Sequence, residues 1–137
     1  MSRGFFADTS GWFPVVNPRD ARHREASEVY MRLVRRGTRV VTTNLVVAEL
    51  HALVTRARGP AASLELLDRL YVDPLHEVRF VDRDLEAAAT DRWLRPFRDQ
   101  RFSLTDAVSF EVMRREGIRR ALALDRHFTV AGFELLI

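Results

Sequence analysis

Short apolar runs alternate along the chain with longer segments in which apolar residues recur every three or four positions. The runs are rich in aromatic, aliphatic and β-branched residues and lie at residues 5–7, 39–43, 78–81, 121–124 and 133–137. Runs of this length, bounded by polar or turn-forming residues, are typical of buried β-strands. The pattern therefore predicts five strands, the first of which ends in a polar turn at residues 8–11.

The periodic segments between these runs predict helices. Glycine and proline mark their ends, as at Gly37 and at Gly59-Pro60, and capping residues precede three of them, namely Asn17 (followed by proline), Asn44 and Asp82. We expect helices over residues 21–36, 44–58, 60–71, 84–97 and 103–117.

Strands that alternate with helices predict a mostly parallel sheet covered by helices on both faces. The fold class expected is thus α/β, a three-layer α/β/α sandwich. Neither an internal repeat nor a linker-like segment divides the chain, so we expect a single domain over residues 1–137.

The composition fits this picture, because 47% of the 137 residues are hydrophobic, enough for one core. No stretch approaches the roughly 20 apolar residues of a membrane span, and the N-terminus lacks the pattern of a secretory signal. We therefore expect a cytoplasmic protein without membrane association. Cysteine is absent, so a metal ion could be bound only through oxygen or imidazole.

The formal net charge is +3, and all 22 basic residues are arginine. Arginine binds phosphate groups through bidentate hydrogen bonds, but the same geometry also suits ion pairs with the 19 acidic residues. The charge is therefore compatible with nucleic-acid binding without requiring it.

Four acids fall near one edge of the predicted sheet. Asp8 and Asp125 directly follow apolar strands, while Glu49 and Asp106 lie in the early turns of two helices, among apolar neighbours. In an open parallel sheet, ligands bind outside the carboxyl ends of the strands, which is where these residues converge.

Each acid also has a purely structural explanation. Asp106 completes a capping-box pattern with Ser103, and Asp8 and Asp125 could each accept backbone hydrogen bonds in a turn. Glu49 is harder to explain in this way, because no arginine stands three or four positions after it; we expect a partner across space. His127, two residues after Asp125, is expected to be structural.

The four acids together are more informative about function than each acid alone. Several carboxylates at one edge repel one another unless a cation neutralises them, and Mg²⁺ or Mn²⁺ prefers oxygen ligands. Such ions activate water for attack on phosphodiesters. The acids therefore predict metal-dependent phosphodiester hydrolysis.

Four sequence blocks resemble the PIN-domain family, in particular the VapC-type toxin ribonucleases of toxin-antitoxin modules. They are Phe-Ala-Asp-Thr-Ser at 6–10, Thr-Thr-Asn-Leu-Val-Val-Ala-Glu-Leu at 42–50, Phe-Ser-Leu-Thr-Asp-Ala at 102–107 and Ala-Leu-Asp-Arg-His-Phe at 123–128. Each block alone is a weak signal, but four in this order and spacing are specific, and they span nearly the whole chain.

The resemblance implies a ribonuclease that uses Mg²⁺ or Mn²⁺ and acts as the toxin of a type II toxin-antitoxin pair. It implies RNA as substrate, a cognate antitoxin as partner and a homodimer. The metal and catalytic residues implied are Asp8, Glu49, Asp106 and Asp125, with Asp8 and Asp106 as the foremost direct ligands. The supporting hydroxyl residues implied are Thr9, Ser10 and Thr105.

Two other functions remain open at this stage. A PIN-like RNA-binding or protein-interaction module without useful turnover would share the fold, although intact acids favour an active site. A phosphoacceptor receiver domain also gathers acids around Mg²⁺, but it expects a lysine near the last strand, and this chain has none.

Overall fold

A computed structural model describes residues 4–137 of the chain. The strands are β1 (Phe5–Ala7), β2 (Val40–Thr43), β3 (His76–Arg79), β4 (Arg120–Leu122) and β5 (Glu134–Leu135). The helices are α1 (Thr9–Val16), α2 (His23–Arg35), α3 (Asn44–Arg58), α4 (Pro60–Val72), α5 (Arg83–Ala89), the π-helical turn η1 (Thr90–Leu94), α6 (Leu104–Glu116) and α7 (His127–Val130).

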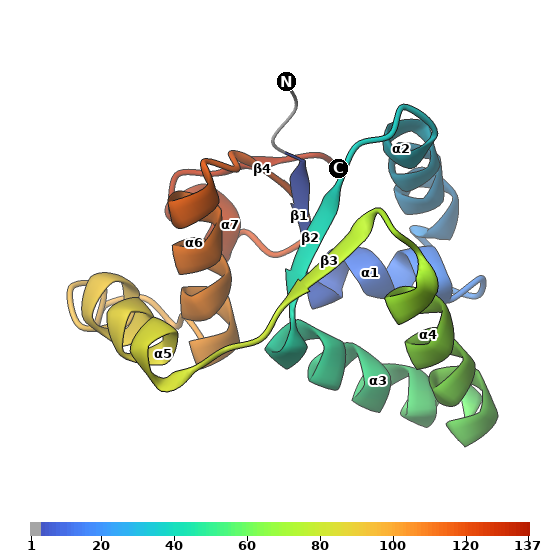
Figure 1. Cartoon of the computed structure of the whole chain (residues 1–137), viewed down its shortest axis with the longest axis horizontal. Helices are drawn as coiled ribbons and strands as arrows, with labels where there is room; N and C mark the ends of the chain where they lie inside the picture. The colour runs from blue at the N-terminus through green and yellow to red at the C-terminus, as the bar shows by residue number, and fades with distance from the viewer. Residues whose placement is uncertain (1–3) are drawn as a thin grey trace.

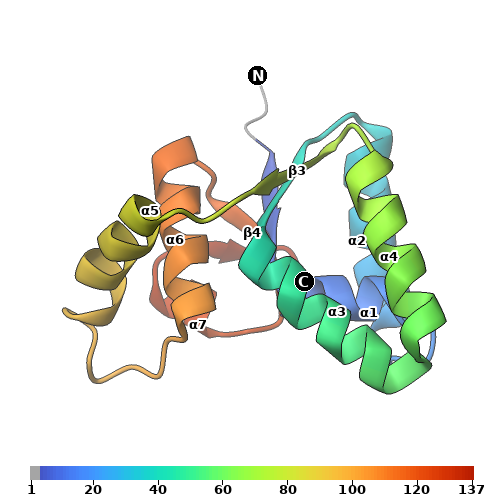
Figure 2. The ribbon, with the colours of Figure 1, turned by 60° about the horizontal axis from the view of Figure 1, so that its bottom comes forward.

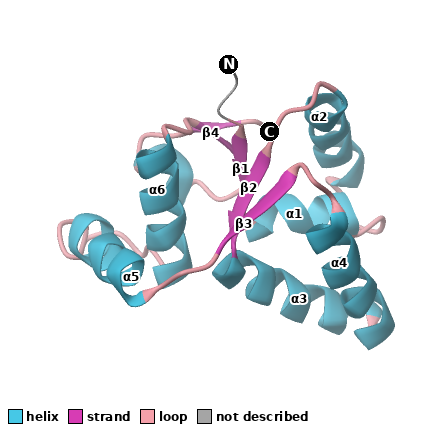
Figure 3. Cartoon of the chain, viewed as in Figure 1, coloured by secondary structure: helices cyan, strands magenta, loops and turns pink. Residues whose placement is uncertain are grey.

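The five strands form one sheet in the order β3-β2-β1-β4-β5. Figure 3 labels strands β1 to β4 of this sheet. All four pairings are parallel; Phe6, for example, pairs with Val41 on one side and Ala121 on the other. The three central strands are almost entirely buried, which explains why they appear in the sequence as continuous apolar runs. The predicted α/β class with a parallel sheet is confirmed.

Helices α1 to α4 lie on one side of the sheet, and α5, α6 and α7 lie on the other (Figures 1 and 2). Strand β2 runs directly into α3, and α6 begins at the same end of the molecule, the lower one in Figure 1. The carboxyl ends of the strands and the first turns of α3 and α6 therefore share one edge.

Helix α1 was not predicted, because Thr9–Val16 contains Gly11 and Pro14 and was assigned in part to a turn. The helix forms here because Asp8 caps it and because Trp12 and Pro14 are buried in the fold. Tertiary packing overrides the weak intrinsic helix propensity of this segment.

Several element boundaries also differ from the predictions. Strand β3 begins at His76, two residues early, because it is the edge strand and its half-buried residues need not be apolar. The predicted helix start at Asn17 and Pro18 is wrong, since Asn17 ends α1 and the next helix begins only at His23.

The caps of α3 and the end of α5 correct two further expectations. Thr43, not Asn44, caps α3 by accepting a hydrogen bond from the amide of Val46, while the Asn44 side chain accepts from the amide of Val81. Helix α5 ends early and continues as η1. Within residues 4–137, no helix is both long and apolar enough to cross a membrane.

Candidate metal centre

Three of the four predicted acids occupy positions fixed by helix starts and strand ends. Asp8 follows β1 and caps α1, Asp106 lies in the first turn of α6, and Asp125 lies in the loop between β4 and α7. The fourth, Glu49, lies in the second turn of α3. All four thus belong to the edge where the parallel strands end, as the sequence predicted.

Asp106 and Asp125 meet at the imidazole of His127. The Nδ1 atom of His127 lies 2.9 Å from Oδ2 of Asp106 and 3.4 Å from Oδ1 of Asp125. One potential ligand atom from each of these three residues falls within 4.8 Å of the others. Asp106 is buried, while Asp125 and His127 are partly exposed, so the cluster opens toward solvent.

Ser10 connects Asp8 to the loop that carries Asp125. Its hydroxyl donates a hydrogen bond of 2.7 Å to Oδ2 of Asp8 and accepts hydrogen bonds from the amides of Leu124 and Asp125, at 2.9 and 3.3 Å. A single side chain therefore joins the end of β1 to the loop after β4, and fixes Asp8 relative to Asp125.

Burial raises the pKa of Asp8 to about 6. Hydrogen bonds from Ser10 oppose this rise, and the nearby charges of Asp106 and Asp125 add to it. A carboxylate that is only 4% exposed and faces two others is costly to keep charged without a cation. The environment of Asp8 is thus the kind that a bound divalent ion would stabilise.

Glu49 joins the group through a hydroxyl bridge. The Thr9 hydroxyl donates a hydrogen bond of 2.7 Å to Oε1 of Glu49, so the glutamate has the partner across space that the sequence led us to expect. Its side chain is exposed rather than surrounded by its apolar neighbours. Glu49 lies outside the tight cluster of Asp106, Asp125 and His127.

Asp106 forms the predicted capping box and also faces the cluster. It forms the capping box with Ser103, accepting from the Ser103 amide at 3.0 Å while its own amide donates to the Ser103 hydroxyl at 2.9 Å. The same Oδ2 atom faces His127. The cap holds the carboxylate rigidly at the cluster. Thr105 lies beside it, but its hydroxyl makes no hydrogen bond to any residue between 4 and 137.

No arginine within the described part of the chain forms an ion pair with Asp8, Glu49, Asp106 or Asp125. Elsewhere arginines do neutralise acids; Glu111, for example, is buried against Arg114 and Arg115. The edge therefore collects oxygen and imidazole donors without a compensating side-chain cation other than a protonated histidine. This donor set fits a divalent metal ion.

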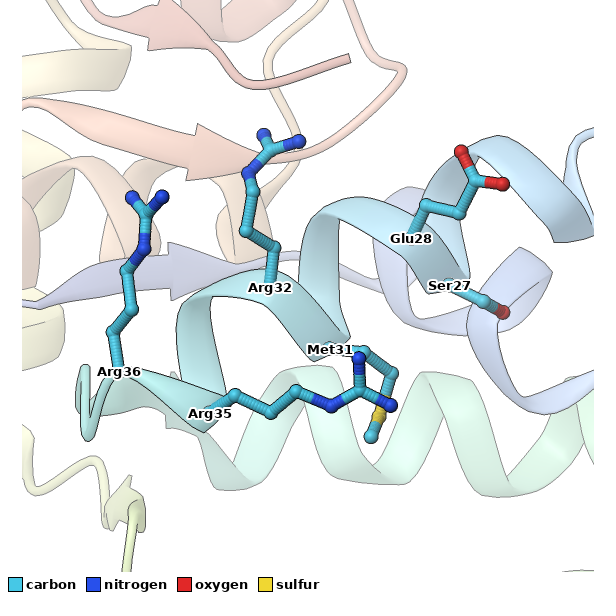
Figure 4. A pocket seen from close by; sticks show the side chains of 6 residues that line it. All are labelled: Ser27, Glu28, Met31, Arg32, Arg35 and Arg36. Carbon is cyan, nitrogen blue, oxygen red and sulfur yellow. The ribbon is translucent and has the colours of Figure 1, made fainter.

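A shallow hollow on α2 includes none of these acids, and Figure 4 shows the side chains that line it. It is lined by Ser27, Glu28, Met31, Arg32, Arg35 and Arg36. Helix α2 ends just before β2 begins, so the hollow belongs to the edge where strands start. Because Arg32, Arg35 and Arg36 form no ion pair with residues 4–137, this surface carries uncompensated positive charge, but none of the acids of the metal centre.

Replacing Ser10 by alanine should destabilise the protein by about 1–3 kcal/mol, because two backbone amides lose their acceptor and Asp8 loses a donor. Denaturant unfolding measures this effect. Ser27→Ala is the matched control, since that hydroxyl makes a single local contact with His23. Equal stability of the two variants would show that the bridge between Asp8 and the loop after β4 contributes nothing.

The chain belongs to the PIN domain family, whose model matches residues 5–134. It is similar to the 23S rRNA-specific endonuclease VapC20 of Mycobacterium tuberculosis, from the CDC 1551 and H37Rv strains. The identity to each is 35% over 128 residues, covering 93% of this chain and 94% of the relative. The resemblance seen in the four sequence blocks is thereby confirmed.

A solved structure supports the same relationship. The crystal structure of Mycobacterium tuberculosis VapC20, described as a sarcin-ricin loop cleaving toxin, superposes with a TM-score of 0.84 at 33% identity. The match covers 95% of this chain and 96% of that one. The chain and this toxin therefore share the whole fold.

The structure places His127 closer to the acids than the sequence indicated. His127 was expected to be structural, yet its ring contacts both Asp106 and Asp125. The signal available was its spacing of two residues from Asp125 at the end of a strand. Alone this spacing is ambiguous, because the contact with Asp106 depends on how α6 packs beside the loop.

Proposed function

We propose that this chain is a metal-dependent endoribonuclease, the toxin of a toxin-antitoxin pair. The observation that supports it most is the convergence of Asp106, Asp125 and His127 beside the buried Asp8, in a chain that belongs to the PIN domain family. Carboxylates gathered without arginine partners favour a site for a divalent cation over a structural ion network.

Asp8, Asp106 and Asp125 would hold the ion, which we propose to be Mg²⁺ or Mn²⁺. Glu49 would bind the same ion directly or through a water molecule. When bound, such an ion lowers the pKa of a water molecule and stabilises charge on a phosphodiester. Ser10 and Thr9 position Asp8 and Glu49 through the hydrogen bonds described above. Thr105, directly before Asp106, would support the site through its hydroxyl, which makes no hydrogen bond within residues 4–137.

The proposed substrate is structured RNA, and the first to test is the sarcin-ricin loop of 23S ribosomal RNA, on which the similar toxin acts. We further propose that the chain forms a homodimer and is inhibited by a cognate antitoxin protein that covers the acidic edge. Light scattering of the purified chain tests the first of these; a strict monomer at micromolar concentration would exclude the dimer.

Cleavage of a panel of RNAs by the purified protein tests the proposed activity. The panel contains a sarcin-ricin loop oligonucleotide, transfer RNA and unstructured RNA, each with Mg²⁺, Mn²⁺ or EDTA. We expect cleavage only with metal, and its loss by at least about a hundredfold in Asp106→Asn, whose amide oxygen can still accept from the Ser103 amide and keep the cap. Asp82→Asn, the same change at the cap of α5, is the control.

Equal cleavage by wild type and Asp106→Asn would assign the activity to a contaminant. If folded wild-type protein binds the RNAs but cuts none of them with any metal, the chain is a PIN-like binding module, and the proposal is wrong.

A further inference from the structure

His127 faces the acidic cluster with one particular ring nitrogen. It is the first residue of α7, and its Nδ1 atom lies within 3.4 Å of carboxylate oxygens from two elements, Asp106 at the start of α6 and Asp125 in the loop after β4. A ring that served only to cap a helix or fill space would not need the same nitrogen directed at both.

The spacing of the three donor atoms suits a shared ion. Adjacent ligands of a six-coordinate ion at bond lengths of about 2.1 Å are separated by about 3 Å. The Nδ1 atom of His127 lies 2.9 Å from one carboxylate oxygen and 3.4 Å from the other. The nitrogen thus already lies about as far from each oxygen as neighbouring ligands of one ion do, and the ligand atoms of the three residues lie within 4.8 Å of one another.

The imidazole is also held in place by a ring contact and by a hydrogen bond of its own backbone amide. Its ring meets that of Phe102 edge-on, with centroids 5.2 Å apart and planes at 74°. The backbone amide of His127 donates to Oδ1 of Asp125 at 2.9 Å, so the ring and the carboxylate move together. Little conformational freedom would be lost on ligation.

We propose that Nδ1 of His127 is a ligand of the same ion as Asp106 and Asp125, and that it makes the centre bind Mn²⁺ and other divalent transition metals more tightly than Mg²⁺. This inference rests on the proposed function and sharpens the nature of its metal. Imidazole suits ions such as Co²⁺, Ni²⁺ and Zn²⁺, whereas Mg²⁺ prefers oxygen and readily replaces a lost ligand by water. Ligation uses the neutral tautomer whose proton is on Nε2.

The alternative is that Nδ1–H only donates a hydrogen bond to Asp106 and so positions its carboxylate. Two substitutions separate these roles. His127→Asn retains an amide N–H close to the position of Nδ1 but removes the nitrogen lone pair that binds a metal. His127→Ala removes both. A positioning role would survive in the asparagine variant, whereas a ligand role would not.

Calorimetric titration of the metal-stripped full-length chain with Co²⁺ and with Mg²⁺ provides the test. We expect the Kd for Co²⁺ to rise at least about tenfold in both His127→Asn and His127→Ala, with a much smaller change for Mg²⁺. The visible absorption of bound Co²⁺ should shift when an oxygen ligand replaces nitrogen. His51→Asn controls for weak binding by other histidines, and melting temperatures in EDTA verify that the variants are folded.

An unchanged Kd and absorption spectrum for Co²⁺ in His127→Asn would overturn the inference, as would equal losses of Co²⁺ and Mg²⁺ binding confined to His127→Ala. Neither result would touch the proposed function, provided that wild type still cuts RNA with a metal. Conversely, if the wild type binds Co²⁺ through His127 but cuts no RNA, the proposed function is wrong and His127 remains assigned as a metal ligand.

Discussion

Replacing Asp8 by asparagine is expected to stabilise the metal-free protein at neutral pH while abolishing metal-dependent cleavage. The pKa of Asp8 is raised from 3.8 to about 6, mainly by burial, so the folded protein holds this proton more tightly than the unfolded chain. Stability linked to that proton is fully present below pH 4 and is lost as the pH rises through 6. Asparagine cannot be deprotonated in this range, so the Asp8→Asn variant does not lose this stability as the pH rises.

The expected difference between Asp8→Asn and wild type is therefore close to zero near pH 4 and grows to about 3 kcal/mol above pH 7. Denaturant unfolding in EDTA at several pH values measures it. Asparagine keeps the cap of α1, because its side-chain oxygen can still accept from the Ser10 amide. Asp82→Asn, at an exposed cap, should show no such pH-dependent gain.

A drop in stability of Asp8→Asn at pH 8 would mean that the carboxylate is well compensated without metal. Adding Mn²⁺ gives a second comparison, since an ion that binds only the folded protein stabilises it by mass action. Mn²⁺ should raise the free energy of unfolding of the wild type, and it should raise that of Asp8→Asn much less.

The second large effect is expected at Gly11, in the first turn of α1. A Cβ atom there would lie 2.0 Å from the carbonyl oxygen of Leu122 and 2.4 Å from its carbonyl carbon. Both atoms belong to the backbone of β4, so no side chain can move aside. Gly11→Ala must push α1 away from the central sheet, at a cost of roughly 3 kcal/mol or more.

The same displacement would separate Ser10 from the amides of Leu124 and Asp125, so cleavage should fall along with stability. Gly37→Ala is the control: a Cβ there meets nothing within 4 Å, and only its φ of +76° opposes the change, which costs about 1–2 kcal/mol. If Gly11→Ala is no less stable than Gly37→Ala by thermal or denaturant unfolding, the close approach of α1 to β4 is not a constraint on the fold.

The sheet and the position of the acids could be predicted because both depend on local signals. Buried parallel strands appear as apolar runs, and the residues that follow them lie at one edge whatever the details of packing. Asp8 and Asp125 are found in this way. Glu49 and Asp106 were placed in the same group by their positions in the early turns of two helices, and the resemblance to the PIN domain family then assigned all four acids to one site.

Long-range contacts could not be predicted in this way. The bridge from Ser10 to Leu124 spans 114 positions, and the contact of His127 with Asp106 spans 21, so neither leaves a periodic signal. Helix α1 depends on a cap and on burial of Trp12 rather than on propensity. Glu49 has apolar sequence neighbours, yet its own side chain is exposed beside Thr9.

A metal titration followed by both binding and cleavage tests the central claim most directly. Mn²⁺ is added to the metal-stripped chain with a sarcin-ricin loop oligonucleotide, and the concentration for half-maximal single-turnover cleavage is compared with the Kd from calorimetry. We predict that the two agree within about threefold and that Asp106→Asn raises both together. Cleavage that persists in EDTA, or that is independent of Mn²⁺ while the ion binds, would contradict a metal centre as the site of RNA hydrolysis.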